Sequence, residues 1–188
     1  MVRGVVLFPG AGSSRDHVAL IAIENELSPL PVLRVDFPYR KAGKKFPDKA
    51  PVLVQSVKDE VRAFAQEIGC ETTELVIGGR SMGGRMCTMA VSDLEDALEV
   101  AGVVCIGYPL HPPKKPEQLR TEHLPRLRTK ALFISGTRDE FGTPEELANA
   151  FALLPSSPTI HFIDGGRHEL KGCDERVATL LKDWLRTV

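Results

Sequence analysis

Short, continuously apolar runs recur along this 188-residue chain and alternate with amphipathic segments of helical length. Most of the runs lack the polar alternation of a strand that has one face in water. Six of them have the length of strands, and they span residues 4–9, 31–37, 74–79, 102–109, 131–136 and 159–164. Strands of this kind are covered by helices on both faces, so the pattern predicts a mainly parallel sheet of about six strands between two helical layers.

The segments between the apolar runs predict five helices, at residues 16–27, 52–68, 82–93, 144–154 and 174–186. Thr143 followed by Pro144 is typical of a helix start, and the acidic residues after them favour the positive end of a helix. Repeated strand–helix units with right-handed crossovers form a doubly wound sheet. No linker or internal repeat interrupts the pattern, so we expect a single α/β domain over residues 1–188, built as a three-layer α/β/α sandwich.

The composition limits which binding partners and which cellular compartment we expect for the protein. The formal net charge of -1, with 26% charged residues, gives no reason to expect nucleic acid or an anionic membrane as partner. The four cysteines are scattered without a CxxC pair, which is typical of thiols in a reducing compartment. The first apolar run is too short to span a membrane and ends at Pro9-Gly10 without a cleavage site. We therefore expect a cytoplasmic protein, and leave a protein partner and the oligomeric state open.

The sequence "GGRSMGG", residues 78–84, places Ser81 among glycines directly after an apolar run. GxSxG at a strand-to-helix junction is typical of a nucleophile elbow, whose strained turn lifts the serine hydroxyl above the sheet. Gly79 and Gly83 fit because side chains two residues before and after the serine would clash. A glycine-rich turn that merely contains a serine is the alternative, but the flanking strand and helix patterns favour a nucleophile. Met82 would begin the helix, and its N–H could face an oxyanion.

A nucleophilic serine needs a base and an acid that orients the base. Asp139 follows the apolar run 131–136, and His168 follows the run 159–164, in the order Ser, Asp, His that this kind of fold uses. Glu140 is the rival acid, but Asp139 is better placed in the pattern Gly-x-x-Asp. All three side chains should meet at one edge of the sheet.

The first turn, "FPGAGSSRDH", offers a second oxyanion donor and also a rival interpretation. Gly10 and Gly12 let the backbone approach a ligand, and we expect the amide of Ala11 to be the donor. The same turn begins like a dinucleotide fingerprint, with Asp36 at the distance of a ribose-binding acid. Arg15 stands where the third glycine of that fingerprint should be, and its side chain would obstruct the close helix–strand packing. We therefore disfavour dinucleotide binding.

Other cofactor signals are absent from the sequence. No Gly-Lys-Ser/Thr follows the glycines, and the five histidines show no HExxH or comparable metal spacing. We expect neither a cofactor nor a metal. Arg15 and Arg85 are expected to tie loops together near the elbow rather than to take part in catalysis.

Several motifs together resemble one known family. "FPGAGSSRDH", "VLRVDFPYR", "IGGRSMGGRM", "GYPLHPP" and "GTRDEFG" are similar to the KANL/Tex-type family of α/β-hydrolase-like proteins, a compact branch without a cap domain near the dienelactone hydrolases. The resemblance runs from about residue 4 to the final helix. It implies a minimal α/β-hydrolase fold, with Ser81, Asp139 and His168 as catalytic triad. The dienelactone hydrolases proper carry a cysteine nucleophile, so their substrate is not carried over.

These observations predict a serine hydrolase that acts on a small or extended ester through an acyl-enzyme. Some relatives in the resembling family look like subunits of chromatin complexes, so a non-catalytic interaction module is the alternative. The candidate pocket walls follow the second and fourth strands or flank the nucleophile: Tyr39, Arg40, Arg80, Tyr108 and His111. Basic side chains in residues 39–45 and 111–116 either attract an anionic substrate or are solvated loop residues.

Overall fold

The computed structural model describes residues 1–188 and contains a six-stranded, fully parallel sheet. The strands lie in the order β2-β1-β3-β4-β5-β6. They are β1 (Gly4–Phe8), β2 (Val32–Arg34), β3 (Leu75–Arg80), β4 (Gly102–Ile106), β5 (Ala131–Gly136) and β6 (Thr159–Ile163). The four inner strands are buried along their whole length, whereas the edge strands β2 and β6 are partly exposed. This burial explains why the inner strands are continuously apolar.

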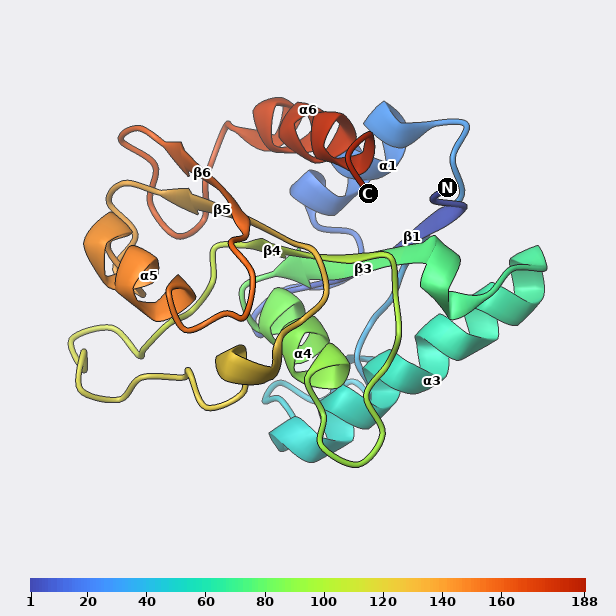
Figure 1. Ribbon diagram of the computed structural model, residues 1–188, viewed down its shortest axis with the longest axis horizontal. Coiled ribbons are helices and arrows are strands. Elements are labelled where there is room, and N and C mark those ends of the chain that lie inside the picture. Colours follow the sequence, from blue (N-terminus) through green and yellow to red (C-terminus); the bar gives the residue numbers. More distant parts are fainter.

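Helices cover both faces of the sheet (Figure 1). The helices α1 (Val18–Leu27) and α6 (Asp174–Leu185) pack side by side on one face. The other face carries α3 (Ala50–Ile68), α4 (Met82–Val91) and α5 (Pro144–Phe151). Two separate hydrophobic clusters fill these layers, with 29 buried residues under α3–α5 and 16 under α1 and α6. The predicted three-layer α/β/α sandwich is confirmed. No helix is both long and apolar enough to cross a bilayer.

The five predicted helices are all present, with ends that differ by a few residues. Thr143 caps α5 as predicted: its hydroxyl accepts a hydrogen bond from the Glu146 N–H at 3.3 Å, and the Glu146 carboxylate accepts one from the Thr143 N–H at 2.8 Å. Three short elements were not predicted, namely α2 (Pro38–Lys41) and the 3-10 turns η1 (Thr72–Glu74) and η2 (Leu124–Arg126). Their few residues carry no periodic pattern.

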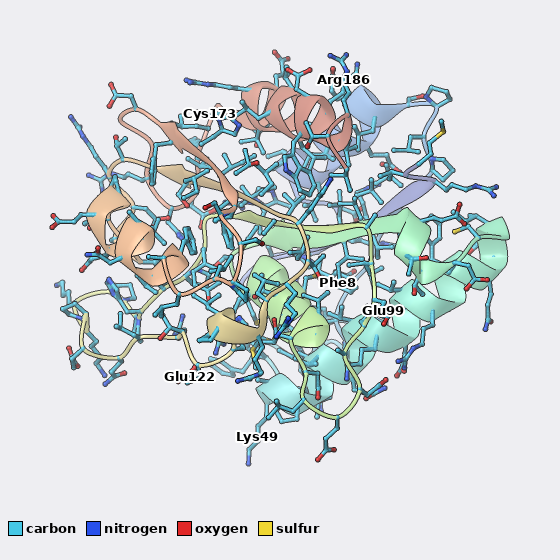
Figure 2. The ribbon with its side chains drawn as sticks, in the orientation of Figure 1. Phe8, Lys49, Glu99, Glu122, Cys173 and Arg186 are labelled. Carbon is cyan, nitrogen blue, oxygen red and sulfur yellow. The ribbon has the colours of Figure 1, made fainter.

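The second strand is shorter than its apolar run. Residues 35–37 were predicted to belong to β2, but the strand ends at Arg34. Val35 still donates its N–H to the Leu7 carbonyl, and the short helix α2 begins three residues later at Pro38. Phe37 packs its ring against Phe8 with centroids 5.3 Å apart, so Val35 and Phe37 lie in the core, whereas Asp36 between them is only half-buried. Figure 2 labels Phe8 in this interior, whereas Lys49 and Glu122 lie at the outer surface.

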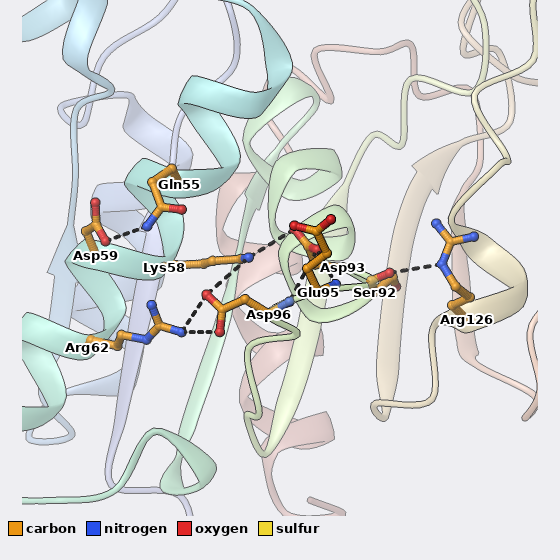
Figure 3. Close-up of polar contacts among 9 residues, drawn as sticks. All are labelled: Gln55, Lys58, Asp59, Arg62, Ser92, Asp93, Glu95, Asp96 and Arg126. Atoms are coloured by element: carbon orange, nitrogen blue, oxygen red, sulfur yellow. Dashed lines mark hydrogen bonds and ion pairs between the residues drawn. The ribbon is translucent and has the colours of Figure 1, made fainter.

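Charged side chains join α3 to the loop that follows α4 (Figure 3). Lys58 is 3% exposed, and its ammonium lies 3.0 Å from Asp93 and 3.4 Å from Asp96. Arg62, one turn further along α3, also contacts Asp96, at 2.8 Å. Arg126 of η2 donates to the Ser92 carbonyl at 3.1 Å. These contacts hold the far end of α4, the helix that begins beside Ser81.

Candidate active site

Ser81 is the single residue between β3 and α4. Its backbone has φ 48° and ψ -115°, a conformation that a non-glycine residue adopts at a cost of about 1–3 kcal/mol. The Ser81 N–H donates to the Ile106 carbonyl at 2.8 Å, which ties the turn to the end of β4. The sharp, strained turn predicted for the GxSxG pattern is therefore present in the structure.

The glycines around Ser81 are needed for a reason that differs from the predicted one. We expected the residues two before and two after the serine to crowd each other. A Cβ atom on Gly79 would instead lie 1.9 Å from the Phe8 carbonyl oxygen, and one on Gly83 would lie 2.3 Å from the same atom. Both glycines therefore let β3 and α4 approach the end of β1.

A hydrogen-bond path joins Ser81, His168 and Asp139. The Ser81 Oγ lies 2.8 Å from His168 Nε2. On the other side of the ring, His168 Nδ1 lies 3.0 Å from Asp139 Oδ1 and 2.9 Å from Oδ2. Because a carboxylate only accepts hydrogen bonds, Nδ1 carries a proton, which leaves Nε2 free to accept from the serine hydroxyl. The structure brings together the three residues singled out in the sequence.

Asp139, rather than Glu140, faces the imidazole. Asp139 is 2% exposed, and its Oδ1 also accepts a hydrogen bond from the Phe141 N–H at 2.8 Å. Glu140 is exposed and makes no hydrogen bond to the imidazole. The Phe141 ring packs on His168 with ring centroids 4.0 Å apart, a contact that the sequence analysis did not anticipate. Phe141 thus shields one face of the imidazole from water.

The two expected oxyanion donors lie beside Ser81 in one cavity. Ala11 and Met82 both line this cavity. Neither backbone N–H donates a hydrogen bond to another group of the chain, so both are available to a ligand. The Ala11 carbonyl accepts a hydrogen bond from the Tyr39 hydroxyl at 2.7 Å, which fixes the first turn.

The cavity has a volume of about 610 Å³ and opens at the carboxyl ends of the inner strands. Parallel α/β sheets place their ligand sites at this edge. Besides Ser81 and His168, its wall includes residues of the first turn, of α3 and α4, and of the loops that follow β4 and β5. Residues from these segments include Gly10, Gly12, Met86, Pro109 and Phe141.

Only one of the five predicted wall residues lines the cavity, namely Arg80. Tyr39 and Tyr108 are fully buried, because both rings pack in the core and both hydroxyls bond to backbone carbonyls. His111 is held in its own loop by the Pro112 carbonyl at 2.8 Å from Nδ1. Arg40 lies on α2, outside the cavity wall. The prediction of these four as wall residues was wrong.

The basic loops also lie outside the cavity wall. None of the lysines of residues 39–45 or 111–116 lines it. Lys41 instead pairs with Glu60 of α3, and Lys44 lies 4.0 Å from Asp48. Lys114 and Lys115 are exposed. This placement supports the interpretation that the lysines are solvated loop residues rather than part of a substrate site.

Arg80 supports the segment that carries His168. The Arg80 side chain is buried, and it donates to the Glu169 carbonyl at 2.9 Å and to the Glu169 carboxylate at 3.1 Å. It also contacts the imidazole of His17, the residue that caps α1. Burial, followed by the charge of Arg80, lowers the pKa of His17. Arg80, at the end of β3, therefore links the segment before α1 to the segment after β6.

Two cavity residues escaped the sequence analysis as functional candidates. Arg85 was expected to tie loops together, yet it forms no ion pair and faces the cavity. Arg120, in the segment between β4 and β5, also lines the cavity. The "GGRSMGGRM" motif contains Arg85, one helical turn after the nucleophile, and this spacing was the available signal. No comparable pattern marks Arg120.

The first turn is built differently from a dinucleotide site. The Arg15 N–H donates to the Asp36 carboxylate at 2.7 Å, so the acid at the ribose-binding position is engaged by the chain itself. The Arg34 side chain donates to the Arg15 carbonyl. No group of three or more His, Cys, Asp or Glu side chains is arranged to hold a metal ion.

Solved structures of other proteins share this architecture. A serine hydrolase homologue from Coxiella burnetii has a TM-score of 0.76 at 17% identity, with 96% of this chain and 83% of that chain covered. A serine hydrolase without lid from Xanthomonas campestris has a TM-score of 0.75 at 16% identity, with coverage of 100% and 83%. A dienelactone hydrolase from Anabaena variabilis has a TM-score of 0.73 at 21% identity, with coverage of 99% and 87%.

At these identities the structural similarity establishes the fold, and the sequence itself establishes the family. The family model of the alpha/beta hydrolase domain matches residues 2–187, nearly the whole chain. The strained serine turn and the parallel sheet therefore belong to a recognised fold: this chain is a member of the alpha/beta hydrolase family.

Proposed function

We propose that the protein is a serine hydrolase that cleaves carboxylic esters, with Ser81 as nucleophile, His168 as general base and Asp139 as the acid that orients the imidazole. The observation that carries this proposal is the hydrogen-bond path from the Ser81 hydroxyl through both ring nitrogens of His168 to Asp139. The burial of Asp139 supports its role, because a shielded carboxylate holds the imidazole in one tautomer.

The reaction follows in two halves. His168 Nε2 takes the proton of Ser81 while Oγ forms a bond to the ester carbonyl carbon, and the carbonyl oxygen becomes an oxyanion. Collapse of this intermediate breaks the carbon–oxygen bond to the alcohol, which leaves with the proton from His168. Water, deprotonated by His168, then attacks the acyl-enzyme, and the bond to Ser81 breaks to release the acid while His168 returns the proton to Ser81 Oγ.

The backbone amides of Ala11 and Met82 are the proposed oxyanion donors. Their location in the Ser81 cavity and their lack of partners in the chain support this role. Loss of one such donor commonly costs about a hundred- to a thousandfold in rate.

The structural relatives add support at the level of reaction class. Two of them are described as serine hydrolases and one as a dienelactone hydrolase. Within the family we assign the chain to the KANL/Tex-type branch, from the motifs around residues 8–17 and 77–86. The scattered thiols favour a cytoplasmic location. The volume of the cavity, about 610 Å³, favours small or extended esters over large lipids.

An activity-based fluorophosphonate probe and a p-nitrophenyl acetate assay test the proposal. We expect the probe to label wild type at Ser81, and both labelling and hydrolysis to vanish in Ser81→Ala and in His168→Ala. Ser14→Ala is the matched control, because Ser14 lies outside the cavity wall. A folded wild type that neither labels nor hydrolyses esters would refute the enzyme and support the non-catalytic interaction module.

A further inference from the structure

Two arginines face the cavity on the side of α4. Arg85 lies one helical turn after the nucleophile, and its backbone N–H donates to the Ser81 carbonyl at 3.0 Å. Arg120 comes from the segment between β4 and β5, 35 positions further along the chain. Both side chains line the cavity that contains Ser81 and His168. The two positive charges therefore share the space that a substrate of Ser81 would occupy.

Neither arginine has a counter-ion in the chain. None of the ion pairs includes Arg85 or Arg120. The Nε–H of Arg85 is enclosed by protein and has no hydrogen-bond partner. Burial, followed by the charge of Arg85, lowers the pKa of Arg120, as expected for two nearby cations without an acid between them. Both side chains are half-buried, and a partly shielded guanidinium without a counter-ion is destabilising, so a bound anion would be favourable.

Arg80, the third arginine of the cavity wall, has an acidic partner within the chain. Arg80 is also buried at the cavity, but it is paired with the Glu169 carboxylate and donates to the Glu169 carbonyl. The remaining acids of the cavity wall are Asp48 and Glu140, and neither is paired with Arg85 or Arg120. The chain therefore pairs one of its three cavity arginines with a carboxylate and leaves the other two without a counter-ion.

Backbone contacts hold the second arginine in place. The Arg120 side chain donates to the Pro109 carbonyl at 3.1 Å. The buried Tyr108 hydroxyl donates to the Arg120 carbonyl at 2.6 Å. Both contacts fix the loop, and neither neutralises the guanidinium. Preorganised cations of this kind bind an anion without a large loss of conformational entropy.

We propose that Arg85 and Arg120 bind a carboxylate carried by the substrate, so that the enzyme prefers esters whose acyl or alcohol portion bears a free carboxyl group. The inference rests on the proposed esterase function. Guanidinium groups hold carboxylates through paired, charge-assisted hydrogen bonds, which are stronger than neutral ones. Arg85 and Arg120 would then select the substrate, while Ser81 and His168 act on its ester bond.

Two pairs of esters test the preference. The p-nitrophenyl monoester of adipate is compared with its neutral methyl ester, and 4-acetoxybenzoate is compared with methyl 4-acetoxybenzoate, after subtraction of the uncatalysed rates. We expect kcat/KM to favour the charged member of at least one pair by about tenfold or more. Arg85→Gln and Arg120→Gln should each lower that ratio by about tenfold. Arg128→Gln, an exposed arginine outside the cavity, is the matched control and should keep the ratio.

A binding measurement separates this inference from the esterase itself. Calorimetric titration of Ser81→Ala with adipate should show binding that weakens at least about tenfold when Arg85→Gln is added. Equal kcat/KM within both ester pairs, together with adipate binding unaffected by Arg85→Gln, would overturn the carboxylate site and leave the esterase intact. Loss of the esterase would appear differently, as absent fluorophosphonate labelling, and the adipate titration would still report on the two arginines.

Discussion

The hydroxyl of Tyr39 donates a hydrogen bond to the carbonyl oxygen of Ala11, 28 positions earlier in the chain, at 2.7 Å. The Tyr39 ring is fully buried and stacks on Phe37, with centroids 6.4 Å apart. A side chain from the segment after β2 thereby fixes the backbone of the turn after β1. Because the Ala11 N–H is a proposed oxyanion donor, Tyr39 acts as a positioning residue for the proposed chemistry.

Tyr39→Phe should therefore lower kcat more than it changes KM. Loss of the hydroxyl frees the Ala11 carbonyl, and small displacements of a positioned group have large effects on rate, so we expect a fall in kcat of about tenfold. Steady-state kinetics on p-nitrophenyl acetate measure the two constants separately. A kcat within twofold of wild type would show that the contact serves stability alone.

The fold could be predicted because its signal is local. The inner strands are buried on both faces, so each is a continuous apolar run whatever its neighbours are. The length of β2 could not be predicted in this way. Val35 and Phe37 are as apolar as strand residues, but they are buried by packing in the core, Phe37 against Phe8, beyond the end of the strand.

The candidate site was predictable in part. Ser81, Asp139 and His168 each follow a strand, and parallel strands end at the same edge of a sheet, so order along the chain was enough to bring them together. Their catalytic roles stay predictions until activity is measured. The residues of the cavity wall depend instead on the conformation of the loops, which has no sequence pattern. Tyr108 is buried in the core, whereas Arg120 lines the cavity from a segment without regular structure.

Gly79→Ala should destabilise the protein strongly, whereas Gly12→Ala should not. A methyl group at Gly79 would overlap the Phe8 carbonyl oxygen, a backbone atom that cannot move without breaking the sheet. We expect a loss of more than about 3 kcal/mol in the free energy of unfolding. A Cβ on Gly12 has nothing within 4 Å, so its change should stay within about 0.5 kcal/mol. Urea unfolding monitored by circular dichroism compares them, and equal losses would contradict the steric argument.

Lys58→Met should destabilise the protein more than Arg62→Met. The Lys58 ammonium is enclosed and pairs with Asp93, so its removal leaves a carboxylate without its partner and should cost about 1–3 kcal/mol. Arg62 pairs with Asp96 at the surface, where water and salt screen the interaction, and its loss should be smaller. Thermal unfolding of both variants at low and at high salt gives the comparison. A larger effect at Arg62 would exclude Lys58 as the main tie between α3 and the loop after α4.

His123 makes stability depend on pH. The ring is buried and lies 2.9 Å from the Thr88 hydroxyl, whose own proton is donated to the Arg85 carbonyl, so His123 Nε2 is the donor in this contact. Burial, with smaller effects of Arg85 and Arg126, lowers the pKa of His123 to about 4 from 6.5. Between these two values the unfolded chain binds a proton that the folded chain does not bind. Stability therefore declines as the pH falls from about 6.5 towards about 4.

His123→Gln removes this titration and should flatten the dependence on pH. From the two pKa values we expect wild type to lose about 2 kcal/mol more than the variant between pH 7 and pH 5. The variant should be less stable at pH 7, because its side chain fits the buried site less well. Urea unfolding at pH 7, 6 and 5 measures the difference, and titrating groups common to both proteins cancel in it. Parallel pH profiles for the two proteins would mean that His123 becomes protonated in the folded state as readily as in the unfolded chain.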